Sequence, residues 1–104
     1  MSSTTERVYE GSDFTVELEW VVEKPVVFVH IGIHKWSPSV GKHMLAMLKD
    51  IEKLAHDRGY NHLCAYNPAQ TDRWKAFMEK FIKYPPLFYL ENGHVVYGRS
   101  VQCL

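Results

Sequence analysis

The segment Val26–Ile33 constrains the fold of this chain more than any other stretch. It reads Val-Val-Phe-Val-His-Ile-Gly-Ile, so apolar side chains fall on both faces of the strand that it predicts. A strand that is apolar on both faces is typical of a sheet interior with parallel neighbours and covered faces. We therefore expect an α/β protein built around this strand.

Helical and extended patterns alternate after this strand. The predicted elements are a strand at 26–33, a helix at 39–56, a strand at 61–66, a helix from about residue 71 to 82, and strands at 87–90 and 94–97. Gly59 ends the first helix, and Tyr84-Pro85-Pro86 stops the second. Asn92-Gly93 predicts a tight hairpin between the last two strands. This order indicates a mixed sheet flanked by helices.

Residues 13–23 carry two patterns at once. Apolar residues alternate from Phe14 to Val22, which is typical of a strand. Phe14, Leu18 and Val21 also share a helix face, with Ser12 or Asp13 as a possible cap. Periodicity alone favours a strand.

Composition places the chain among soluble globular proteins of one domain, residues 1–104. It is 46% hydrophobic, and its 12 basic and 12 acidic residues give a formal net charge of zero, so we expect no nucleic-acid partner. The polar N-terminus lacks a signal peptide and no apolar run is long enough to span a bilayer, so we expect a cytoplasmic protein, or one inside an assembled particle. Cys64 and Cys103 have no metal or redox spacing, which predicts two reduced thiols.

Two segments resemble the two halves of a thioredoxin active site. Trp36 precedes a proline-containing turn and a long helix, and Pro85 lies seven residues before Asn92 in the hairpin. The resemblance covers roughly residues 12–101. It implies a thioredoxin-like α/β fold, a helix at 13–23, and a cis-proline at Pro85 that faces the redox loop. The chain departs from that family after the last predicted strand, where we expect the closing C-terminal helix to be missing.

The same loop lacks the chemistry of thioredoxin. The degenerate redox positions are Trp36, Ser37, Pro38 and Ser39, and neither serine can form a disulfide. We interpret Ser39 as a helix N-cap. The resemblance then implies a redox-inactive module that binds a protein partner or a larger assembly, viral or multiprotein, without a cofactor. The expected binding residues are Trp36, Pro38, Tyr84, Pro85 and Pro86. A thiol-dependent oxidoreductase remains an alternative.

A second resemblance leads to another class of protein. Val40-Gly41-Lys42 at a helix start, Arg58-Gly59-Tyr60, and Asn67 ahead of an aromatic-rich helix resemble the GNAT acetyltransferases. The resemblance implies a small acetyltransferase that binds acetyl-CoA.

Two features of the sequence indicate that such an acetyl-CoA site is eroded. The GNAT pyrophosphate loop uses backbone N–H groups of glycines at a helix start. Pro38 has no N–H here, and Gly41 alone remains of the glycines. The tyrosine that acts as the acid would fall at Phe77 or Met78, and neither side chain can donate a proton.

Three histidines, as possible metal ligands, suggest a metal site. The geometry of a strand argues against it. His30 and His34 project from the same side of the predicted strand, with His43 close in sequence. Residues four apart on a strand are about 13 Å apart, because each residue rises about 3.3 Å. We therefore expect no metal site at these residues.

Overall fold

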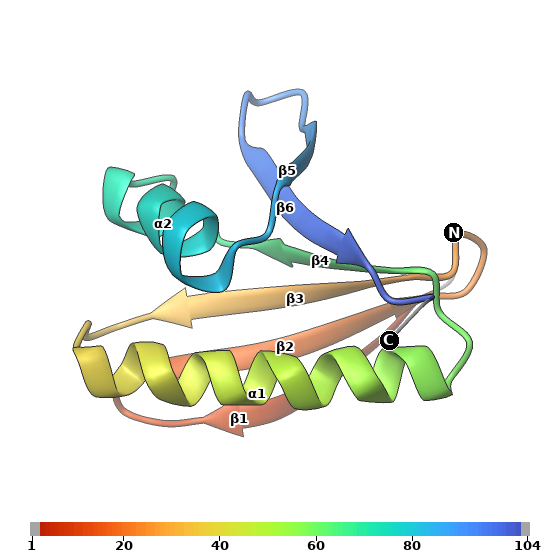
Figure 1. Cartoon of the computed structure of the whole chain (residues 1–104), viewed down its shortest axis with the longest axis horizontal. Coiled ribbons are helices and arrows are strands. Elements are labelled where there is room, and N and C mark those ends of the chain that lie inside the picture. The colour runs from red at the N-terminus through yellow and green to blue at the C-terminus, as the bar shows by residue number, and fades with distance from the viewer. Residues whose placement is uncertain (1–2, 103–104) are drawn as a thin grey trace.

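The computed structural model describes residues 3–102 and confirms an α/β fold with a mixed sheet flanked by helices (Figure 1). The elements are β1 (Ser3–Glu10), β2 (Phe14–Val21), β3 (Val26–Ile33), α1 (Pro38–Asp57), β4 (His62–Tyr66), α2 (Asp72–Ala76), the π-helix η1 (Phe77–Ile82), β5 (Pro86–Tyr89) and β6 (Val95–Ser100). Within residues 3–102, no helix is both long and apolar enough to cross a membrane.

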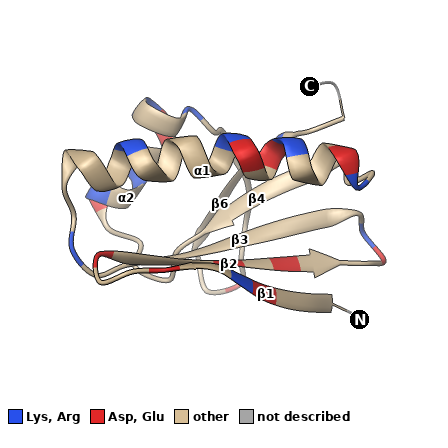
Figure 2. Cartoon of the chain, turned by 90° about the horizontal axis from the view of Figure 1, so that it is seen from below, with Lys and Arg blue, Asp and Glu red and all other residues tan. Residues whose placement is uncertain are grey.

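The six strands form one sheet in the order β1-β2-β3-β4-β6-β5. Among the described strands only β3 and β4 pair in parallel, because α1 carries the chain back between them. Figure 2 shows α1 and α2 on the same side of the sheet. The core lies between this face and the helices, and it includes Leu18, Val29, Met44, Leu63 and Trp74.

Residues 14–21 form a strand, as the alternation predicts, so the helix implied by the thioredoxin resemblance is wrong here. Phe14, Val16 and Leu18 are buried, while Thr15 and Glu17 between them are only partly covered. One face of β2 therefore packs under the helices and the other does not. The edge strand β1 was not expected from the sequence, because its side chains are largely polar and exposed.

Helix α1 begins at Pro38, one residue before the predicted range of 39–56. The Ser37 hydroxyl accepts a hydrogen bond from the Val40 backbone N–H at 3.1 Å, so Ser37 is the N-cap and not Ser39. Pro38 suits the first helical position, because its missing N–H would have no partner there and its φ is already helical. At the other end, Gly59 has φ +80°, which confirms its predicted place just past the helix.

The second helix starts as expected but ends in a different geometry. Thr71 caps α2, which continues directly into the π-helix η1. Lys83 then takes a left-handed conformation, φ 66°, and turns the chain into β5. All described peptide bonds are trans, so the cis bond implied at Pro85 is not found. The predicted hairpin is confirmed as β5 and β6.

Candidate functional site

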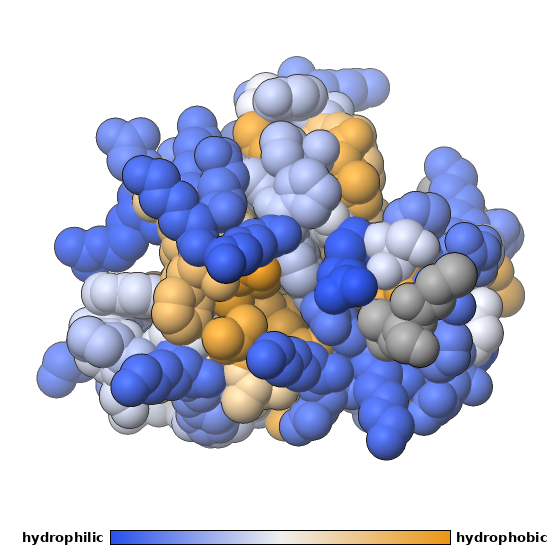
Figure 3. Space-filling view, in the orientation of Figure 1, coloured by the Kyte–Doolittle hydropathy of each residue, from blue (hydrophilic) through white to orange (hydrophobic). Residues whose placement is uncertain are grey.

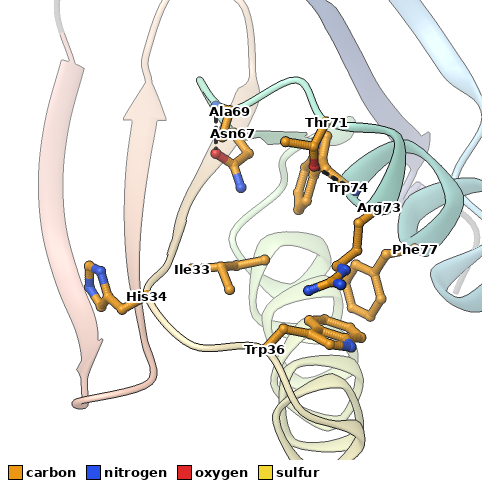
Figure 4. Close-up of a pocket in the computed structure, with 9 residues that line it drawn as sticks. All are labelled: Ile33, His34, Trp36, Asn67, Ala69, Thr71, Arg73, Trp74 and Phe77. Carbon is orange, nitrogen blue, oxygen red and sulfur yellow. Dashed lines mark hydrogen bonds between the residues drawn. The ribbon is translucent and has the colours of Figure 1, made fainter.

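The parallel strands β3 and β4 part at their carboxyl ends, and a cavity opens there. Their pairing runs from Val26–His62 to His30–Tyr66. Beyond that point β3 leads to α1, while β4 turns toward α2. The cavity has a volume of about 220 Å³ and is lined by Ile33, His34, Trp36, Asn67, Ala69, Thr71, Arg73, Trp74 and Phe77 (Figure 4). Ligands of α/β sheets bind characteristically at such carboxyl ends.

One side of this cavity is formed by the loop after β4, which begins with Asn67. The Asn67 Oδ1 accepts a hydrogen bond from the Ala69 backbone N–H at 2.9 Å, which folds the loop into an Asx turn. Gln70 holds the loop further, because its amide donates to the Asn67 carbonyl and accepts from the Val95 N–H. The Asn67 side-chain nitrogen is left turned toward the centre of the cavity (Figure 4).

Trp74 lines the cavity from the first turn of α2. Its backbone N–H donates to the Thr71 hydroxyl at 3.1 Å, which fixes the first turn of α2. Its indole Nε1 is buried and has no hydrogen-bond partner among the described residues. A buried N–H without a partner costs free energy.

A second cavity of about 440 Å³ adjoins the first. It is lined by Trp36, Pro38, Gly41, Lys42, Arg73, Ala76, Phe77, Lys80 and Phe81, and so shares three of these residues with the first. The Trp36 ring meets the Phe77 ring edge-on, with centroids 5.0 Å apart. We call the two cavities together the Trp36 cleft. Figure 3 shows apolar surface between α1 and the α2–η1 helix, bordered by hydrophilic side chains.

The charges on the Trp36 cleft are all of one sign. Lys42, Arg73 and Lys80 line it, and no aspartate or glutamate does. The cleft therefore has a local excess of positive charge, because the whole chain has a formal net charge of zero. A cleft with apolar walls and cations of one sign attracts an anionic ligand.

The start of α1 offers few backbone donors to that ligand. Pro38 has no N–H, and the Val40 N–H is bonded to the Ser37 hydroxyl. The Gly41 N–H donates to the Ser37 carbonyl at 3.1 Å. A Cβ added at Gly41 would lie 3.2 Å from the Trp36 ring, so a larger side chain there would require the ring to shift. Anion binding at this end of the cleft therefore depends on side chains.

The structure separates the residues that the sequence suggested as one binding surface. Trp36 and Pro38 line the cleft, and Ser37 caps α1 beside them. Tyr84, Pro85 and Pro86 line another cavity, of about 340 Å³, together with Glu79 and Lys83. Tyr84 is buried there, whereas both prolines are exposed.

Cys64, His30 and His43 lie away from the cleft, whereas His34 lines it. Burial of Cys64 raises the pKa of its thiol to about 11, which keeps it protonated and unreactive. Cys103 lies outside the described residues. His30 bonds to Glu19, and His43 packs against aromatic rings on the other face of the sheet, so the three histidines are not brought together. No cluster suited to a metal ion occurs within residues 3–102.

Sequence reasoning missed most of the polar residues of the cleft. In the sequence, Lys42 attracts attention only as part of the Val40-Gly41-Lys42 motif. Arg73, Trp74 and Lys80 look like residues of an ordinary amphipathic helix. Arg73 and Lys80 are seven residues apart, and on a predicted α-helix this spacing puts both on one side. That spacing was the signal in the sequence from which a basic side of the helix could have been predicted. Searches of family models and of curated proteins find no match to this chain.

Proposed function

We propose that this chain is a redox-inactive binding module whose Trp36 cleft holds an elongated anionic ligand. One observation carries the proposal: the cleft at the carboxyl ends of the parallel strands is lined by Lys42, Arg73 and Lys80 and by no carboxylate. The redox-inactive part follows from Ser37 and Ser39 in the loop and from the buried thiol of Cys64.

The ligand class follows from the resemblance to GNAT acetyltransferases. Of the residues that carry this resemblance, Gly41, Lys42 and Asn67 all line the Trp36 cleft. The residues that carry the thioredoxin resemblance, Trp36 and Pro85, line separate cavities instead. Arg58, Gly59 and Tyr60 lie at the other end of α1 and do not line the cleft. The part of the GNAT resemblance that does line it suggests a ligand of the coenzyme A type.

Such a coenzyme fits the side chains of the cleft better than its backbone. Lys42, Arg73 and Lys80 match its phosphates in charge, and the two shared cavities suit a long molecule. The glycine-rich backbone cradle is absent, as the hydrogen bonds of Val40 and Gly41 describe. An acyl-CoA supplies an activated acyl group when bound. Because Phe77 and Met78 cannot donate a proton, we expect binding without efficient transfer.

Thermal unfolding in the presence of acetyl-CoA tests the proposal. A ligand at about one hundred times its dissociation constant adds about 2.7 kcal/mol to the free energy of unfolding. We expect the melting temperature to rise with acetyl-CoA and with adenosine 3′,5′-bisphosphate, and less with uncharged pantetheine. No rise at about 1 mM acetyl-CoA would contradict the proposed ligand.

Two lysines on α1 give a matched pair of variants. Lys42→Glu reverses a charge in the cleft, and Lys53→Glu reverses one on the exposed side of the same helix, away from both cavities. We expect Lys42→Glu to abolish most of the ligand-induced rise and Lys53→Glu to retain it. Equal loss in both variants would indicate nonspecific attraction of the phosphates.

A second candidate function is assembly with a protein partner. The observation that favours it is the exposed segment after Tyr84, where Pro85, Pro86 and all of β5 face solvent. Native mass measurement after gentle purification, with an insulin-reduction assay on the same sample, tests it. A stoichiometric complex without reductase activity supports assembly, and thiol-dependent turnover by a free monomer contradicts it.

A further inference from the structure

Strand β5 leaves one edge of the sheet without a partner. It lies last in the strand order, so only its β6 side is hydrogen-bonded within the described sheet. Leu87, Phe88 and Tyr89 are consecutive and are 41%, 38% and 69% exposed. Figure 3 shows an apolar area at the top of the molecule, where Figure 1 places β5. Exposed apolar edge strands are templates for pairing with another strand.

The register of β5 makes this edge more apolar than a regular strand would be. The pairing shifts between Pro86 and Phe88, which is the signature of a β-bulge. Leu87 and Phe88 consequently lie on the same side of the sheet, the side away from the helices. There they line one groove of about 540 Å³ with Phe28 and Cys64. The free edge therefore borders a continuous apolar surface.

The charges at the two ends of β5 are complementary to those of a second, antiparallel copy of the same strand. Lys83 precedes the strand and Glu91 follows it, both exposed and without an ion-pair partner among the described residues. An antiparallel pair of two β5 strands about a two-fold axis brings the Lys83 end of each next to the Glu91 end of the other. The net charge of zero adds no repulsion between copies.

We propose that a second copy of this chain pairs with the free edge of β5, antiparallel and centred on Leu87. The two sheets then form one continuous sheet, and the same surface serves both copies, as two-fold symmetry requires. Pro85 and Pro86 limit the pairing, because Pro86 has no N–H to donate and the strand has only four residues. The dimer is independent of what the Trp36 cleft binds.

Sedimentation velocity over a range of protein concentrations tests this dimer. We expect a concentration-dependent dimer of the wild-type chain. Phe88→Lys places a charge on the edge and should leave a monomer, whereas Val8→Lys on the opposite edge strand β1, at a residue 40% exposed, should leave the dimer intact. Dimer loss with Val8→Lys alone would place the contact on β1 and overturn the proposal, as would a monomeric wild-type chain.

Charge exchange tests the same contact without touching the packed side chains. Lys83→Glu and Glu91→Lys should each weaken dimerisation about tenfold, because each change sets like charges together at both ends of the two-fold contact. The double variant Lys83→Glu with Glu91→Lys should restore wild-type dimerisation. Additive weakening in the double variant would exclude the antiparallel β5 pair, and circular dichroism confirms that each variant is folded.

Discussion

Glu52 is a buried carboxylate on the core side of α1. A buried carboxylate is tolerated only where hydrogen-bond donors or cations compensate its charge. Glu52 accepts a hydrogen bond from the Tyr84 hydroxyl and lies 3.4 Å from Arg99, its nearest cation. Burial, and then the bond to Glu52, raises the pKa of Tyr84, so the phenol remains a donor. This contact joins α1 to the segment between η1 and β5, where Lys83 has its left-handed conformation.

At the scale of this residue we predict that Tyr84→Phe destabilises the fold. The change removes the main donor to a buried carboxylate, so we expect a loss of about 1.5–3 kcal/mol in the free energy of unfolding. Urea denaturation followed by tryptophan fluorescence measures it. Tyr89→Phe is the control, because Tyr89 is exposed and should leave stability unchanged. Equal stability of Tyr84→Phe and wild type would show that Glu52 finds another donor.

At the scale of the element, the structure shows which of two serines caps α1: it is Ser37, whereas the sequence favoured Ser39. Ser37→Ala removes the oxygen that accepts from the Val40 N–H and should cost about 1 kcal/mol. Ser39→Ala changes an exposed residue inside the first turn and should change stability by less than about 0.5 kcal/mol. Urea midpoints of the two variants measure the difference, and the reverse order would restore Ser39 as the cap.

The elements predictable from the sequence are those whose period is set by burial on one face. The alternation from Phe14 to Val21 gave β2 correctly, because one side of that strand packs under the helices. Strand β1 could not be predicted, since it is an exposed edge whose order comes from pairing with β2 and not from its own side chains. The π-helix η1 was equally hidden, because apolar spacing does not distinguish it from the end of an α-helix.

The Trp36 cleft was only partly predictable for a similar reason. Trp36 and Asn67 attract attention in the sequence, since each follows a predicted strand. Their meeting with Arg73 depends on β3 and β4 being parallel neighbours, which is a long-range property. The orphaned Nε1 of Trp74 is visible only after side chains are packed.

At the scale of the whole molecule, three buried weak acids in the C-terminal half of the chain, Cys64, Tyr84 and Tyr97, make stability depend on pH in the alkaline range. Burial raises the pKa of Cys64 from 9.0 to about 11 and that of Tyr97 from 10.0 to about 12, and it raises that of Tyr84 as well. All three groups are neutral when protonated, and unfolding lowers their pKa values. Their contribution is therefore complete below about pH 9 and is lost as the pH rises through the folded-state values.

We predict that the urea midpoint is constant from about pH 7 to 8.5 and falls steadily from about pH 9 upward. Cys64→Ala removes the group with the lowest unfolded-state pKa, so the fall in that variant should begin about one pH unit higher, where the phenols of the unfolded chain begin to ionise. Urea titrations of both proteins at matched pH values measure the two onsets. If both onsets coincide, the thiol of Cys64 is not protected by the fold, and its burial in the sheet between Phe28 and Gly98 does not persist in solution.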